Sequence, residues 1–272
     1  MSDSATPIPP AQIPPPPPPG RRPLRTKGIY LLPNLFTTGT LFGGFYAIVM
    51  AMGGRFDHAC VGILVAMFAD GLDGRIARMT NTSTDFGKEY DSLCDMVAFG
   101  IAPAIVIYAY SLSGLAEYRW LGGKLGWVIA FTYAACAALR LARFNVLANI
   151  AGGSKDFFGL PSPAAAALVT FFVWSAVDVW EVSGRDVLFV AAPLTLLTAL
   201  SMVSSIRYNS FKKLNLGGRM RFLPFAAVVG LLALVAINPP QVLFVVFLIY
   251  AASGPLTVLW RRLRRPPVAP KA

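Results

Sequence analysis

The sequence predicts an all-α fold, a polytopic transmembrane bundle of about eight helices. Hydrophobic residues make up 56% of the 272 residues, charged residues only 14%, and the mean hydropathy is +0.59. Such a chain is too apolar for a soluble domain. Apolar segments of about 20 residues, the length of a helix that spans a bilayer, recur along it. The basic residues recur between these segments and do not form one patch with aromatic residues, so a nucleic-acid partner is not expected.

The chain begins with a Pro-rich, basic arm at residues 1–27, which we expect to be disordered and partly polyproline II. Residues 28–206 then hold six predicted spans, which would form the catalytic core. These spans are residues 33–52, 58–77, 92–113, 125–146, 160–180 and 187–206. The fifth opens on Pro161 and Pro163, which suit the first turn of a helix.

The C-terminal part contains a predicted basic cytoplasmic loop, two further spans and a basic tail. In order these are residues 207–222, 223–238, 240–260 and 261–272. Asn238, Pro239 and Pro240 provide the only turn between the last two spans, and a re-entrant pair is the alternative. We expect this part to lie beside the core as two additional transmembrane helices within residues 223–260.

The distribution of Lys and Arg predicts the orientation. If the N-terminus is cytoplasmic, 20 of the 24 basic residues lie on the cytoplasmic side. The other four are Arg55, Arg119, Lys124 and Arg185. Because cytoplasmic loops carry an excess of basic residues, both termini are predicted to be cytoplasmic. We expect a multi-pass protein of the cell (inner) membrane, surrounded by membrane lipids, with its active site at the cytoplasmic face.

The segment ADGLDGRIARMTNTSTDFGKEYDSLCD, residues 69–95, places four aspartates at the ends of two apolar segments. Helical geometry puts Asp70 and Asp73 on one face of one helix. Asp91 and Asp95 share a face of the next. Facing helices would bring all four carboxylates together, where they need protons or cations to coexist. Oxygen ligands suit Mg²⁺ or Mn²⁺, and four carboxylates make two ions plausible.

Neighbouring residues fit phosphoryl-type transfer at such a site. Gly71, Gly74 and Gly87 leave room for a nucleotide or phosphate to approach the backbone. Arg75 and Arg78 could balance phosphate charge. A carboxylate could accept the proton of an attacking hydroxyl. A purely structural interpretation, in which Asp and Arg pair at a helix interface, stays open, but ionisable residues within membrane segments indicate function.

The same segment fits the pattern D-x₂-D-G-x₂-A-R-x₈-G-x₃-D-x₃-D, with Gly71 at the first x. The matching residues are Asp70, Asp73, Gly74, Ala77, Arg78, Gly87, Asp91 and Asp95. In this the chain resembles the CDP-alcohol phosphotransferases. The resemblance implies a helical membrane enzyme with a two-metal centre, which cleaves the diphosphate of a CDP-linked donor, releases CMP and passes the phosphatidyl group to an alcohol.

The resemblance also implies roles for individual residues. Asp70, Asp73, Asp91 and Asp95 would be metal ligands, and Asp95 would also be the general base. Gly71, Gly74, Arg78 and Gly87 would lie against the donor. Pro33, Asn34 and Thr38 look like a family element that places Asn34 and Thr38 near the donor. The family precedent implies a homodimer.

Further phrases outside the pattern resemble the CDP-diacylglycerol serine O-phosphatidyltransferases within this family. They are PNLFTTGTLFGGFYAI, DFGKEYDSLCDMVAFGIAPA, ALRLARFN and FFGLPSPAAAA. This implies CDP-diacylglycerol and L-serine as substrates. Arg140 and Arg143 could receive the serine carboxylate, near Asn145 and Ser162, although inner-end arginines also serve as membrane anchors. Two alternatives stay open: another acceptor (glycerol 3-phosphate, inositol phosphate or choline), or a cation or proton transporter.

Overall fold

The computed structural model describes residues 31–80, 84–118, 123–150, 159–206, 208 and 222–263. All regular secondary structure in these ranges is helical, which confirms the all-α prediction. The elements are α1 (Leu31–Met52), α2 (Phe56–Thr80), α3 (Asp85–Asp95), the π-helical turn η2 (Met96–Ile101), α4 (Ala102–Tyr110), the 3-10 turn η3 (Leu112–Glu117), α5 (Leu125–Ile150), α6 (Ser162–Asp178), α7 (Leu188–Val203), α8 (Phe222–Ile237) and α9 (Pro239–Leu263). The predicted arm at 1–27 and most of the predicted loop and tail lie outside the described residues.

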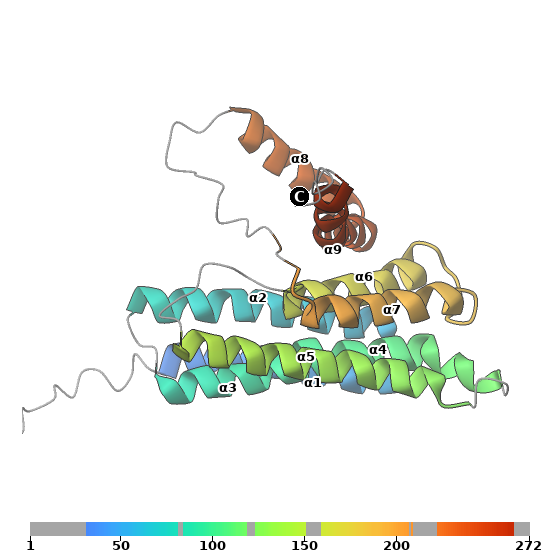
Figure 1. Cartoon of the computed structure of the whole chain (residues 1–272), viewed down its shortest axis with the longest axis horizontal. Coiled ribbons are helices and arrows are strands. Elements are labelled where there is room, and N and C mark those ends of the chain that lie inside the picture. The colour runs from blue at the N-terminus through green and yellow to red at the C-terminus, as the bar shows by residue number, and fades with distance from the viewer. Residues whose placement is uncertain are drawn as a thin grey trace, which may run out of the picture.

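Helices α1 to α7 form one bundle, with α9 packed on α6 and α8 joined to α9 (Figure 1). The rings of Phe171 and Phe172 on α6 contact Phe247 and Phe244 on α9, with centroids 5.8 and 5.7 Å apart. The break between α8 and α9 falls at Asn238, where the sequence places Pro239 and Pro240. Helix α9 is therefore held to the bundle by aromatic packing.

Small residues bring α1 close to its neighbours. A Cβ added at Gly43 would lie 2.7 Å from the carbonyl oxygen of Gly62 on α2, and one at Gly44 would lie 2.6 Å from the Cα of Ala98. Neither position can hold a larger side chain without moving a backbone. Membrane helices depend on such close packing, because lipid provides no hydrophobic force to drive them together.

Four described stretches are long and apolar enough to cross a bilayer: Asn34–Met52, Asp85–Tyr110, Leu125–Leu147 and Pro239–Val258. The apolar helices α6 and α7 are shorter. Helix α2 has 25 residues, but its acidic and basic residues interrupt the apolar stretch. The span predicted at 92–113 begins earlier, at Asp85, because α3, η2 and α4 are continuous. The helices are those of a membrane protein, and the number eight and the location of the termini stay predictions.

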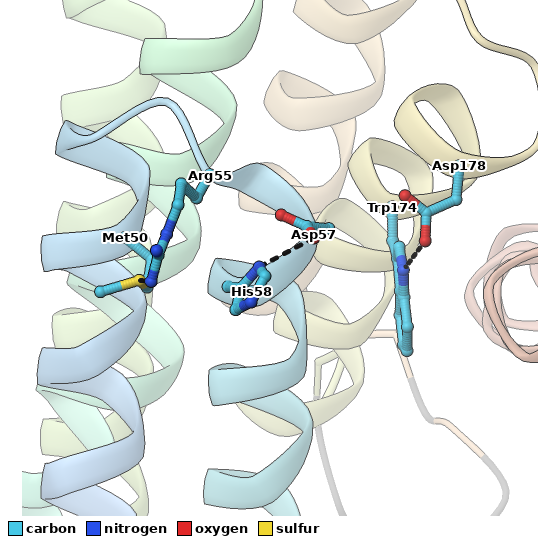
Figure 2. A network of polar contacts seen from close by, with 6 residues as sticks. All are labelled: Met50, Arg55, Asp57, His58, Trp174 and Asp178. Atoms are coloured by element: carbon cyan, nitrogen blue, oxygen red, sulfur yellow. Dashed lines mark hydrogen bonds and ion pairs between the residues drawn. The ribbon is translucent and has the colours of Figure 1, made fainter.

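Polar residues also gather where α2 begins and α6 ends (Figure 2). The indole Nε1 of Trp174 donates to Asp178 Oδ2 at 2.6 Å, and His58 Nδ1 lies 2.8 Å from Asp57 Oδ2. Asp57 is about 24 Å along α2 from Asp73, from the helical rise per residue. These groups satisfy one another at the end of the bundle opposite the motif aspartates, so the two ends are chemically separate.

Candidate metal and substrate site

Three of the four motif aspartates converge. Asp70 comes from α2, and Asp91 and Asp95 come from α3. One carboxylate oxygen of each lies within 4.8 Å of the others, and we call these residues the three-aspartate cluster. The Oδ1 atoms of Asp91 and Asp95 are buried and have no hydrogen-bond partner among the described residues. Since unpartnered buried carboxylate oxygens are costly, this donor set fits a hard divalent cation.

Asp73 lies next to this cluster but is held differently. Its side chain is buried, and its Oδ2 accepts a 3.0 Å hydrogen bond from Thr37 Oγ1 on α1. The charge of Asp73 also acts on the three-aspartate cluster. The structure thus brings all four predicted aspartates into one region. Asp73, however, is not part of the three-aspartate cluster. The sequence analysis did not predict a role for Thr37. Thr37 and Thr40 are polar residues three apart in an apolar segment, and both are buried on one face of α1.

Local signals at the start of α3 place Asp91 and Asp95. Thr84 caps the helix, because its Oγ1 accepts from the backbone N–H of Gly87 at 3.0 Å, as N-cap residues commonly do. Asp91 and Asp95 follow one turn apart and so project from the same face. The π-helical turn η2 begins directly after Asp95, and such turns often occur at functional sites. On α5, Tyr133 donates to the carbonyl of Phe99 within η2 at 3.2 Å.

The predicted donor glycines lie in two different environments. A Cβ added at Gly71 or Gly74 would meet nothing within 4 Å among the described residues. This face of α2 is therefore open beside the three-aspartate cluster, as a bound nucleotide requires. At Gly87 a Cβ would lie 3.1 Å from Thr84 Oγ1 and 3.6 Å from Asn34 Oδ1. Gly87 is thus packed against the N-cap Thr84 and Asn34, and a larger residue would crowd them.

Thr38 joins α1 to α3. Its hydroxyl donates to the carbonyl of Asn34 at 2.7 Å and lies 3.0 Å from the hydroxyl of Tyr90. Because a threonine hydroxyl has only one proton, Tyr90 is the donor in the second bond. Asn34 and Thr38 therefore meet α3 near its first turns, and Tyr90 is a neighbour that the sequence did not reveal. Arg78 is near the end of α2, and its side chain is outside the described part of the structure.

The predicted acceptor residues separate into two groups. Arg140 Nη1 donates to Ser162 Oγ at 2.7 Å, its buried Nε has no partner among the described residues, and its charge acts on Asp95. Asn145 instead donates to Ser92 Oγ on α3 at 2.9 Å. Arg143 is on the exposed side of α5. Arg140 and Ser162 therefore meet beside the three-aspartate cluster, whereas Asn145 connects two helices.

Comparison with known proteins identifies the family of the chain. Residues 30–199 match the family described as CDP-alcohol phosphatidyltransferase. The chain is 37% identical over 226 residues to the CDP-diacylglycerol--serine O-phosphatidyltransferase of Helicobacter pylori. The aligned residues make up 83% of this chain and 90% of the relative. It is 30% identical over 242 residues to the protein of the same name from Mycobacterium bovis, covering 88% and 82%.

An archaeal relative extends the comparison. The chain is 36% identical over 179 residues to the archaetidylserine synthase of Methanothermobacter thermautotrophicus, covering 65% of this chain and 69% of the relative. The family match includes every predicted site residue and ends before α8 and α9. With most of its helical bundle matched, the chain belongs to the CDP-alcohol phosphatidyltransferase family of enzymes.

Proposed function

We propose that the protein transfers the phosphatidyl group of CDP-diacylglycerol to the hydroxyl of L-serine, giving phosphatidylserine and CMP. Two relatives are named for both substrates, and the archaeal relative is named for a serine product. The single observation that carries the proposal is the three-aspartate cluster with the half-buried Arg140 beside it. This pairing provides a cation site and an anion site next to each other.

Asp70, Asp91 and Asp95 would hold a divalent ion, Mg²⁺ or Mn²⁺, and Asp73 would contribute to a second. Their carboxylate oxygens are ligands that both ions accept. The buried Oδ1 atoms of Asp91 and Asp95, which have no hydrogen-bond partner within the described ranges, support the fit. When bound, such ions neutralise the donor diphosphate and stabilise charge on the leaving phosphate.

Asp95 would accept the proton. In the reaction the serine hydroxyl oxygen forms a bond to the phosphorus that carries diacylglycerol. The bond from this phosphorus to the CMP oxygen breaks, and the hydroxyl proton passes to the Asp95 carboxylate. Asp95 is favoured for this role because the family resemblance gives it, and because its buried Oδ1 has no hydrogen-bond partner among the described residues.

Arg140 would bind the carboxylate of serine. Its guanidinium donates to Ser162 through Nη1, while Nε has no partner among the described residues. A guanidinium suits carboxylates because it can donate two parallel hydrogen bonds. A cationic acceptor such as choline does not match this charge. Glycerol 3-phosphate and inositol phosphate are anionic, so the names of the relatives are what favour serine over them.

The cytoplasmic face of the cell membrane is the proposed location of the site. Its residues come from the start of α1 and α6, from the last turn of α3, and from the last turns of α2 and α5. All belong to the end of the bundle that we predict to be cytoplasmic from the distribution of basic residues. There a lipid diphosphate and a water-soluble acceptor can meet. A homodimer stays a prediction.

Release of CMP by the purified full-length chain tests the proposal. The assay contains CDP-diacylglycerol in detergent micelles and Mn²⁺, with L-serine, glycerol 3-phosphate, inositol phosphate or choline in separate reactions. We expect only serine to stimulate release and phosphatidylserine to accumulate in equal amount. Stimulation by another alcohol and not by serine would replace the acceptor and keep the chemistry. No stimulation by any of them would reject the transferase proposal for these substrates.

A further inference from the structure

We infer that Thr37 is a positioning residue, which orients the Asp73 carboxylate for the proposed metal centre, on which this inference rests. Thr37 Oγ1 donates to Asp73 Oδ2 at 3.0 Å across the contact between α1 and α2. Both residues are buried, with 4% and 5% of their surface exposed. A hydrogen bond to a charged group in such a place contributes more than one at the surface.

The packing of α1 on α2 explains why a short side chain can reach Asp73. At Gly43, an added Cβ would lie 2.7 Å from the backbone of Gly62. One helical turn earlier, a Cβ at Gly39 would lie 3.7 Å from the Cβ of Ala69. Helices α1 and α2 are therefore still in contact at Ala69, one turn before Asp73. Thr37 reaches it because the small residues set the distance between the helices.

The hydrogen bond makes the two oxygens of Asp73 different. Oδ2 accepts the hydrogen bond of Thr37, so Oδ1 is the oxygen without this bond, and the backbone of Gly74 also hydrogen-bonds the carboxylate. Asp73, with this bond, lies outside the tighter grouping of Asp70, Asp91 and Asp95. Groups that hydrogen-bond a metal ligand set its orientation and its affinity for the ion. Thr37 would act in this way and would not touch the substrate.

Thr40 provides a matched control on the same helix. It is a buried threonine one turn after Thr37, with 0% of its surface exposed. Its hydroxyl donates to the carbonyl of Phe36 on its own helix at 3.3 Å. A Thr40→Val change therefore removes a buried hydroxyl from α1 without altering the contact with Asp73.

Titration with Mn²⁺ alone, without either substrate, tests the inference. Free Mn²⁺ is counted by electron paramagnetic resonance over wild type, Thr37→Val, Thr37→Ala, Thr37→Ser and Thr40→Val, all in detergent. We expect the Val and Ala variants at Thr37 to bind at least one ion roughly 10- to 100-fold more weakly, the range for lost partners of metal ligands. Thr37→Ser, which keeps the hydroxyl, and Thr40→Val should bind as wild type does.

Two further measurements separate positioning from a merely structural role. Melting temperatures are recorded without metal, and Thr37→Val is repeated in an Asp73→Asn background, where it should have no further effect on Mn²⁺ affinity. Wild-type Mn²⁺ affinity in the folded Thr37→Val or Thr37→Ala protein would overturn the inference, as would equal losses in Thr37→Ser. Absence of Mn²⁺ uptake by wild type would instead reject the metal centre itself.

Discussion

The guanidinium of Arg140 donates a 2.7 Å hydrogen bond to the hydroxyl of Ser162, and this contact joins the last turns of α5 to the first turn of α6. The two residues are far apart in sequence, yet they meet beside Asp95, on which the charge of Arg140 acts. Ser162 uses one donor group of the guanidinium, and Nε has no hydrogen-bond partner in the part of the chain that the structure describes. The contact therefore holds the guanidinium of Arg140 in a defined orientation.

Replacing Arg140 is expected to weaken serine binding more than donor binding. Hydrogen bonds to charged groups contribute about 1.5–3 kcal/mol, so Arg140→Gln should raise the KM for serine roughly 10- to 100-fold. The KM for CDP-diacylglycerol should change little. Initial rates over a matrix of both substrates measure the two constants. Arg185→Gln is the control, because Arg185 pairs with Glu117 outside the site. Parallel increases in both KM values would place Arg140 on the donor instead.

Asp95→Asn should abolish proton acceptance while leaving the shape of the site. Positioned general bases contribute about 10²- to 10⁴-fold, so kcat should fall by this range. Binding of CDP-diacylglycerol, measured by calorimetry in detergent, should be largely retained. Asp57→Asn changes an exposed carboxylate at the opposite end and should leave kcat unaltered. An Asp95→Asn enzyme with near wild-type turnover would show that another group takes the proton.

Removal of divalent cations should stop the reaction reversibly. We expect EDTA to eliminate serine-dependent CMP release and added Mn²⁺ to restore it. Ligand binding to the folded state stabilises it by about 2.7 kcal/mol at 100 times Kd, so Mn²⁺ should also raise the Tm. Asp91→Asn should lose this rise, whereas Asp178→Asn, whose carboxylate binds Trp174, should keep it. A rise in Tm that persists in Asp91→Asn would assign the bound ion to another place.

Replacing a glycine by alanine should affect stability at Gly43 on α1 but not at Gly74 on α2. Gly43→Ala should lower the free energy of unfolding by about 1–3 kcal/mol, because a Cβ there overlaps the backbone of Gly62. Gly74→Ala should retain wild-type stability, since its Cβ meets nothing within 4 Å among the described residues, and should raise the KM for CDP-diacylglycerol. Melting curves and donor titrations distinguish the two effects. Loss of stability in Gly74→Ala with an unchanged KM would make that glycine a packing residue.

The sequence by itself determined the class of fold and the chemistry to look for. Apolar segments of bilayer length can satisfy their backbone only as helices, so an all-α membrane protein followed from composition. The spacing of Asp70 and Asp73, and of Asp91 and Asp95, put each pair on one helical face. Local signals also marked the break at Asn238. These features depend on residues near one another in the chain, which is why periodicity could find them.

Tertiary structure alone decided how these faces meet. Asp70 joins Asp91 and Asp95, whereas Asp73 accepts a hydrogen bond from Thr37. The small residues around Gly43 let α1 approach α2 closely enough for the second contact. Packing likewise places Arg140 where it donates to Ser162, and Asn145 where it donates to Ser92 on α3. A helical repeat states which residues share a face, but not the distance, rotation or partner of that face. Those are set by side-chain packing between helices distant in sequence.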